Sequence, residues 1–130
     1  FGQIAPIRSG EHAGTVDLKH GGTGPVVELA RVFALAGAID AVNTNDRLER
    51  AAQSGEVGEQ GARDLRDAFE FIGKLRIAHQ ARQTGSGRPA DNFLLLAELS
   101  NFERSHLKAA FSMVNGLQDL LGQRYLAGRF

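Results

Sequence analysis

Two long stretches of the chain carry apolar residues at helical spacing, and they constrain the fold more than any other feature. The first covers residues 59–84, and the second runs from about residue 100 to residue 126. In each stretch the apolar residues recur three and four positions apart, which places them on one side of an α-helix. In the first stretch this apolar side is wide enough to pack against more than one neighbour. We therefore expect two long helices within a bundle.

The start of the second long helix is the clearest boundary in the sequence. Ser100 is followed three residues later by Glu103, which is the pattern of a capping box. The glycine- and proline-containing residues 85–89 end the first long helix and form a loop. Between this loop and Ser100, residues 93–99 are expected to form a short turn of helix that covers the end of the bundle.

Two shorter helices are expected before the long ones. The first should cover residues 25–36, because Pro25 suits the first position of a helix. The second should follow Thr44, with Thr44 or Asn43 as its cap, and should end at Gly55. Short connections between these helices favour neighbours that pack directly on each other.

Residues 1–24 are expected to be an irregular N-terminal segment, with a short extended piece at residues 15–18. Residues 25–130 then form one helical domain. The predicted fold class is all-α, an antiparallel four-helix-type bundle with an irregular N-terminal segment. Because the chain starts at Phe1 without a methionine or a signal pattern, we expect it to be a fragment of a longer protein.

Composition excludes several classes of function. The chain has 15 basic and 15 acidic residues, so it lacks the excess positive charge that a broad nucleic-acid surface needs. No apolar run reaches the ~20 residues that span a bilayer. The absence of cysteine excludes disulfides and thiolate metal sites and suits a reducing compartment such as the cytoplasm.

A lysine and a pair of glycines precede the first expected helix. Backbone N–H groups beside Gly21 and Gly22 could approach a phosphate, and Lys19 could neutralise it. The spacing is not that of a P-loop, so a structural turn is the simpler interpretation. Lys19 could equally pair with Asp17 or with an acidic residue of a helix.

Four polar residues continue the apolar side of the first long helix. Arg76, His79, Gln80 and Gln83 lie three or four positions apart and share one face. They form either a buried hydrogen-bond network or the wall of a ligand site. The planar guanidinium of arginine suits carboxylate or phosphate groups.

Further polar candidates lie on the other helices. His106 and Lys108 belong to a charged cluster on the last helix, and His106 is expected on its inner side, where it could face His79. Two histidines without an obvious third ligand make a poor zinc site, so neutral core histidines are the better interpretation. Arg47 opposes the dipole of its helix, which predicts an acidic partner.

The candidates for that partner of Arg47 are Asp64, Asp67 and Glu70. No nucleophile elbow, cysteine nucleophile or acid–base pair is marked by spacing, so no catalytic residue and no metal ligand is assigned in this chain.

Several motifs in a fixed order carry a resemblance to a known family. They are VDLKHGG (16–22), PVV (25–27), AR (30–31), TNDRL (44–48), DLRDAFEF (64–71), LRIAHQ (75–80), DNF (91–93) and LKAAF (107–111). Together they resemble the C-terminal helical domain of bacterial nucleotidyltransferases that accompany cyclic-nucleotide-binding and CBS domains. This family is known as the nucleotidyltransferase substrate-binding domains.

The resemblance implies an accessory module that forms one wall of the nucleotide and acceptor cleft. Catalysis, Mg²⁺ and a nucleoside triphosphate would belong to an upstream nucleotidyltransferase domain, because its Gly-Ser and Asp-x-Asp motifs are not found here. The expected binding residues are Lys19, Arg47, Arg76, His79, Gln80, His106 and Lys108. If the resemblance holds, the cationic members and His79 should converge on one concave surface, which would receive a protein or small-molecule acceptor.

A second interpretation is a non-catalytic module for homodimerisation or signal relay. Here the polar clusters would be structural networks, and the wide apolar faces of the long helices would leave room for a partner helix.

Overall fold

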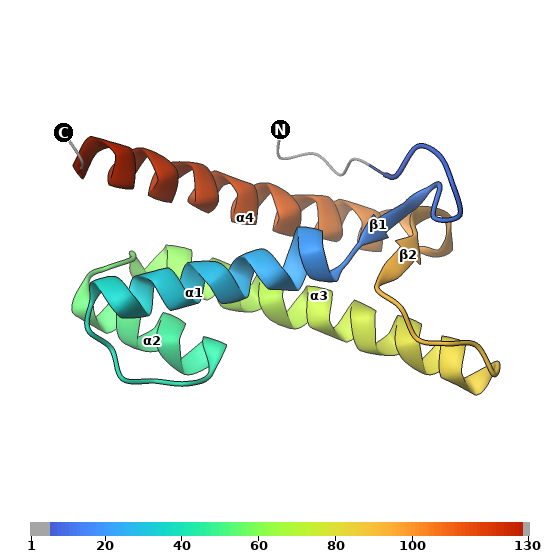
Figure 1. Ribbon diagram of the computed structural model, residues 1–130, viewed down its shortest axis with the longest axis horizontal. Coiled ribbons are helices and arrows are strands. Elements are labelled where there is room, and N and C mark those ends of the chain that lie inside the picture. Colours follow the sequence, from blue (N-terminus) through green and yellow to red (C-terminus); the bar gives the residue numbers. More distant parts are fainter. Residues whose placement is uncertain (1–5, 129–130) are drawn as a thin grey trace.

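The computed structural model describes residues 6–128, and the side chains of residues 6–123. Four α-helices account for most of this part of the chain (Figure 1): α1 (Gly24–Ala36), α2 (Thr44–Ser54), α3 (Glu59–Gly85) and α4 (Asn101–Gly128). Two short strands, β1 (Thr15–Asp17) and β2 (Phe93–Leu95), and two short helical turns, η1 (Lys19–Thr23) and η2 (Leu96–Glu98), complete the fold. The predicted all-α bundle is confirmed.

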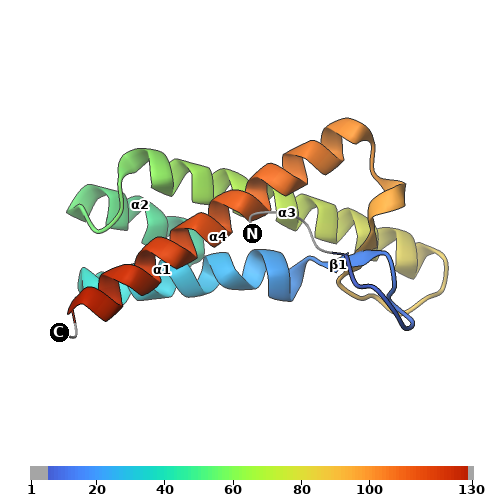
Figure 2. The ribbon, with the colours of Figure 1, turned by 90° about the horizontal axis from the view of Figure 1, so that it is seen from above.

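The two longest helices, α3 and α4, run in opposite directions (Figure 1). Seen from above, α4 crosses α3 diagonally and continues toward the far end of α1 (Figure 2). The connection of residues 37–43 turns back along the molecule before α2 begins. The third helix therefore packs against both α2 and α4, as its wide apolar side predicts.

Side-chain caps fix the start of two helices where the sequence predicts them. The Asn43 side chain accepts a hydrogen bond from the Asp46 N–H at 2.8 Å and begins α2. Ser100 Oγ accepts from the Glu103 N–H at 3.1 Å, while Glu103 Oε1 accepts from the Ser100 N–H at 2.9 Å. These reciprocal bonds confirm the capping box at the start of α4.

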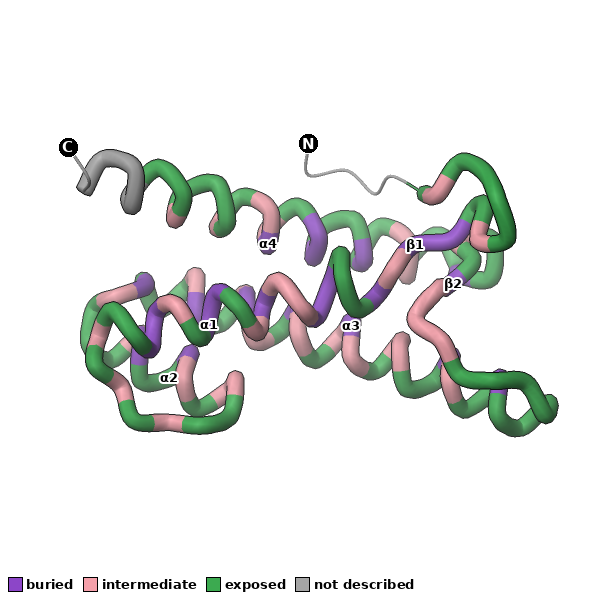
Figure 3. Tube along the Cα trace, in the orientation of Figure 1, coloured by how far each residue is buried: buried purple, intermediate pink, exposed green. Residues whose placement is uncertain are grey.

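The described core lies where the helices face one another (Figure 3). Its largest fully buried side chains are Leu18, Leu48, Leu65, Ile72, Leu94, Leu107, Val26 and Val114. Leu18 directly follows β1, and the other residues come from β2 and all four α-helices. A single cluster therefore joins the whole described bundle. Burying each large aliphatic side chain contributes about 1.5–3 kcal/mol before the entropy of ordering is subtracted.

A small antiparallel sheet joins the N-terminal segment to the connection between α3 and α4. Val16 pairs with Leu94, and both side chains are buried. The short extended piece expected near residues 15–18 is thus confirmed as β1. The helical turn expected over residues 93–99 is correct only for η2, because residues 93–95 form a strand that pairs with β1 and buries Leu94.

Candidate functional site

Asn92 forms hydrogen bonds with two of the polar residues of α3. Its Oδ1 accepts hydrogen bonds from Arg76 Nε at 2.6 Å and from Gln80 Nε2 at 3.2 Å. Its backbone carbonyl accepts from the Leu18 N–H at 2.8 Å. Asn92 therefore ties the face of α3 to the segment that carries Lys19, two regions that are far apart in the sequence.

The preceding residue, Asp91, holds the other two polar residues of α3. Its Oδ1 lies 2.9 Å from His79 Nε2, and its N–H donates to Gln83 Oε1 at 2.8 Å. Burial raises the pKa of Asp91, but hydrogen bonds from His79, the Phe93 N–H and Gln83 outweigh it and lower the pKa overall. Asp91 is therefore a carboxylate at neutral pH, and it accepts a hydrogen bond from the N–H group at His79 Nε2.

The turn that carries Lys19 is built by Asp17. Its Oδ1 accepts from the N–H groups of Lys19 at 3.0 Å and His20 at 2.9 Å, and its Oδ2 lies 2.9 Å from His20 Nδ1. Burial raises the pKa of Asp17, but the hydrogen bonds with His20 and Lys19 lower it overall. Asp17 thus binds Lys19 only through its backbone N–H, and the predicted ion pair of the Lys19 ammonium with Asp17 or a helix acid is not found in the described part of the chain.

The second glycine of the pair, Gly22, serves packing in this turn. A Cβ atom at Gly22 would lie 2.9 Å from Ile72 Cγ2 and 3.3 Å from Phe111 Cε1, so a side chain there would collide with the core. Gly22 is buried, and its neighbour Thr23 donates its N–H to the Leu18 carbonyl at 2.9 Å. The structure therefore favours the structural turn over a phosphate cradle at this position.

A hollow of about 580 Å³ lies between η1, the first half of α1 and the middle of α3; we call it the α1–α3 pocket. Its lining residues are Lys19, Thr23, Gly24, Val27, Glu28, Phe69, Glu70, Gly73, Lys74, Arg76, Ile77 and Gln80. The pocket thus brings together three of the residues predicted from sequence, Lys19, Arg76 and Gln80. Its apolar members, Val27, Phe69 and Ile77, come from both α1 and α3 and form the less polar part of the wall.

The charges around the α1–α3 pocket favour an anion. Three cationic side chains line it, Lys19, Lys74 and Arg76, and the terminal nitrogens of Arg76 remain available because Nε alone binds Asn92. Of the two acidic residues in the lining, Glu28 is paired with Arg31 at 2.8 Å. A phosphate or carboxylate group that enters this pocket would therefore meet more free positive than negative charge.

His79 lines a different cavity, of about 640 Å³, between the end of α3, the connection to β2, η2 and the start of α4. We call it the α3–α4 pocket. Its lining residues are Leu75, Ala78, His79, Arg82, Gln83, Ser86, Arg88, Glu98, Leu99 and Glu103. The polar face of α3 therefore contributes residues to two cavities. Asp91 binds His79, which lines the α3–α4 pocket, and Asn92 binds Arg76, which lines the α1–α3 pocket.

The remaining predicted binding residues, Arg47, His106 and Lys108, line neither pocket. Arg47 Nε donates to the Ala41 carbonyl at 2.8 Å. The prediction of an acidic partner for Arg47 is therefore wrong, because its guanidinium binds a backbone carbonyl of the connection before α2. Asp64, one of the predicted partners, instead accepts a hydrogen bond from Gln60.

The inner position predicted for His106 is also wrong. Its ring is exposed and stacks on Phe71, with ring centroids 3.7 Å apart, because the neighbouring Leu107 occupies the buried side of α4. Lys108 is exposed on the same helix. His79 and His106 thus have different partners, and within the described part of the chain no three histidine, aspartate or glutamate side chains gather as metal ligands.

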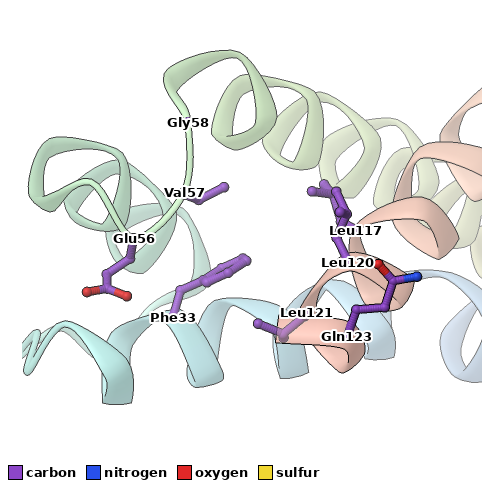
Figure 4. A pocket seen from close by; sticks show the side chains of 8 residues that line it. All are labelled: Phe33, Glu56, Val57, Gly58, Leu117, Leu120, Leu121 and Gln123. Carbon is purple, nitrogen blue, oxygen red and sulfur yellow. The ribbon is translucent and has the colours of Figure 1, made fainter. Parts of the chain in front are cut away.

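An apolar groove of about 490 Å³ lies under the second half of α4. Figure 4 shows the side chains of Phe33 and Val57 pointing toward Leu117 across this space. Leu120, also in the lining, is 61% exposed. Within the described part of the chain, this end of the bundle therefore offers an exposed apolar surface of the kind that accepts another helix.

Sequence reasoning missed Lys74 and the pair Asp91–Asn92 as parts of these sites. Lys74 lies two residues before Arg76. Helical spacing therefore places it beside the polar face of Arg76, His79 and Gln80, on the side of α3 that lines the α1–α3 pocket. Asp91 and Asn92 follow a loop, and their link to α3 depends on tertiary contacts. The one available signal was their position directly before the apolar residues 93–96.

Among the helices that the structure describes, none combines the length and the apolar character that a bilayer crossing requires.

Comparison with known proteins identifies the family. A family model described as "Putative nucleotidyltransferase substrate binding domain" matches residues 1–125. A search of the curated proteins and a search of the solved structures each found no significant match. The family match covers nearly all of the 130 residues and agrees with the ordered motifs of the sequence. The chain therefore belongs to the nucleotidyltransferase substrate-binding domain family.

Proposed function

We propose that this domain forms one wall of a nucleotidyltransferase cleft and that the α1–α3 pocket holds the anionic part of a substrate there. One observation carries the proposal. Lys19 from η1 and Lys74 and Arg76 from α3 line one hollow together with apolar residues of α1 and α3, in a member of a family named for substrate binding. Such a site suits a phosphorylated ligand, since charge-assisted hydrogen bonds are strongest where water is partly excluded.

Each lining group has a distinct task in this proposal. The planar guanidinium of Arg76, oriented by Asn92, would present two terminal nitrogens to one phosphate or carboxylate group. Lys19 and Lys74 would add mobile positive charge from the two sides. Val27, Phe69 and Ile77 would contact the less polar part of the ligand.

The chemical step itself would take place outside this domain. Mg²⁺ bound to a nucleoside triphosphate would supply charge stabilisation in the reaction. Among the described residues no three acidic or histidine side chains come together, so we assign no metal ligand to this domain. An upstream nucleotidyltransferase domain would hold the metal, and this domain would select the acceptor, a protein or a small molecule.

The wider setting of the parent protein follows from the same family resemblance. We expect a bacterial, cytoplasmic protein in which CBS or cyclic-nucleotide-binding domains regulate transfer. The reading frame upstream of Phe1 tests this expectation directly: a Gly-Ser motif followed by Asp-x-Asp on an α/β pattern would support it.

The binding proposal is tested with isothermal titration of nucleoside triphosphates into this chain and into the intact protein. We expect Arg76→Ala and Lys74→Ala each to weaken binding by about tenfold or more, the usual effect of losing a hydrogen bond to a charged group. Arg63→Ala is the matched control, since Arg63 lies on the same helix and binds Gln60 away from the pocket. Lys74 makes no hydrogen bond or ion pair in the described structure, so its variant should fold normally.

Unchanged affinity in both pocket variants would remove the α1–α3 pocket from the binding of nucleoside triphosphates. Loss of transfer activity in full-length Arg76→Ala, with normal folding, would support its role in the cleft.

A second candidate function is an interaction module, and the apolar groove beneath α4 favours it. The groove between Phe33, Val57 and Leu117 could accept a helix from a second copy, giving a homodimer that relays a signal. Sedimentation of the intact protein at high concentration distinguishes the cases. A monomer throughout would exclude self-association, whereas a dimer abolished by Leu120→Glu would support it.

A further inference from the structure

The α3–α4 pocket is lined by a buried histidine, and only one of its two ring nitrogens has a hydrogen-bond partner in the described structure. His79 is 6% exposed, and its Nε2 is bound to Asp91 Oδ1 at 2.9 Å. Its second ring nitrogen, Nδ1, has no hydrogen-bond partner among the residues that the structure describes. Nδ1 is not sealed from solvent. Because His79 lines the α3–α4 pocket, we infer that a ligand would reach Nδ1 from this pocket.

The Asp91 carboxylate determines what Nδ1 offers to a ligand. A carboxylate only accepts hydrogen bonds, so the proton of the neutral ring stays on Nε2 and Nδ1 carries a lone pair. When Nδ1 takes up a proton, the positive ring lies between Asp91 on one side and the cavity on the other. An anionic ligand in the cavity would then complete an arrangement of anion, imidazolium and anion.

The other charged groups that face the α3–α4 pocket come from every element around it. From α3, Arg82 lies 3.8 Å from Glu98 of η2 and is occupied by that pair. From α4, Glu103 is occupied by the capping box with Ser100. Arg88, from the connection to β2, has no side-chain partner in the described structure.

Two charged or ionisable groups are thus left for a ligand in this pocket, the Arg88 guanidinium and His79 Nδ1. Both favour an oxyanion, the first permanently and the second after it takes up a proton. Gln83 adds a side-chain amide to the wall, and Leu75, Ala78 and Leu99 form its apolar part. A ligand with a small apolar body and one charged end matches this division.

We propose that the α3–α4 pocket is a second ligand site, distinct from the α1–α3 pocket, which binds a small organic oxyanion. The ligand carries a carboxylate or a phosphate monoester that pairs with Arg88 and with His79 Nδ1, and its apolar part lies against Leu75 and Leu99. Binding is accompanied by proton uptake at His79. The site uses none of the residues that line the α1–α3 pocket, so the two proposals stand or fall separately.

Benzoate and phenyl phosphate serve as probes of the two oxyanion classes, and benzamide and benzyl alcohol serve as neutral controls of similar shape. Titration calorimetry of the whole chain near pH 7, in two buffers with different ionisation enthalpies, measures both affinity and proton uptake. We expect one of the anions to bind with net proton uptake and to shift the NMR signals of the His79 ring. We expect the neutral controls to bind at least tenfold more weakly.

Two variants then assign the binding to the pocket. Arg88→Ala changes an exposed loop residue and should leave the fold intact, and it should weaken anion binding by about tenfold. His79→Gln should abolish the proton uptake. Lys74→Ala, in the other pocket, is the matched control and should bind the anion like the unaltered chain.

Failure of both anions to bind at millimolar concentration would overturn the proposal. Binding that Arg88→Ala and His79→Gln leave unchanged, or that shows no proton uptake, would overturn it as well. Weakening by Lys74→Ala instead of Arg88→Ala would place the anion in the α1–α3 pocket and reject the second site.

Discussion

The packing role of Gly22 leads to a sharp prediction, because its neighbour Gly21 provides an internal control. A methyl group at Gly22 would approach Ile72 Cγ2 to 2.9 Å, whereas one at Gly21 would lie 3.7 Å from the nearest atom of Phe111. Ile72 is fully buried and cannot move aside without disturbing the core. Neither glycine has a positive φ, so alanine meets no backbone strain at either position.

Overpacking of this kind costs about 1–3 kcal/mol. For 130 residues, an unfolding entropy of about 2.1 cal/mol/K per residue converts this cost into a Tm lower by roughly 4–10 °C. Gly21→Ala should stay within about 0.5 kcal/mol of the original chain, or gain slightly from the lower entropy of its unfolded state.

Urea denaturation followed by circular dichroism measures both variants, and the difference between them isolates the collision, since the backbone contribution is similar at the two sites. Equal stability of the two variants would refute the packing role of Gly22. If Gly22→Ala also kept its stability but lost binding of nucleoside triphosphates, the phosphate cradle at this turn would become the better explanation.

Two further predictions concern hydrogen bonds that begin helical segments. Ser100→Ala removes one half of the capping box and should lower the free energy of unfolding by about 1 kcal/mol, whereas Ser105→Ala within α4 should change it little; equal effects in thermal denaturation would contradict the cap. Asp17→Asn should destabilise the chain at neutral pH, because the lowered pKa of Asp17 means that its ionised form stabilises the fold above the ordinary value of about 4. This difference should disappear as the pH falls through the folded-state pKa of Asp17, so a difference that persists at pH 2 in urea titrations would reject the ionic contribution.

The helices were predictable because their signals are local. Asn43 and Ser100 form hydrogen bonds with groups three residues away, so these caps depend on nearby residues and not on distant parts of the chain. The strand at residues 93–95 was not predictable in the same way, because its partner lies in residues 15–17. A short apolar run gives no period by which a strand and a helical turn can be distinguished.

The candidate sites were predictable only in part, for the same reason. Spacing on one helix correctly grouped Arg76, His79 and Gln80, but it could not show that Asn92 and Asp91 divide them between two cavities. The error at Arg47 has a related cause. The unfavourable helix dipole predicts that the Arg47 side chain needs a partner, but it does not say that the partner is acidic. In the structure the partner is the backbone carbonyl of Ala41.

The adjacency of Asp91 and Asn92 has a thermodynamic consequence. One peptide bond joins the residue that orients His79 to the residue that orients Arg76, so a displacement of either would act on the other. Two ligands that each strain or relax this dipeptide would be linked, and the factor by which one changes the affinity of the other would be the same in both directions. Replacing the rigid pair with residues that cannot anchor to α3 would uncouple the two cavities even where both still bind.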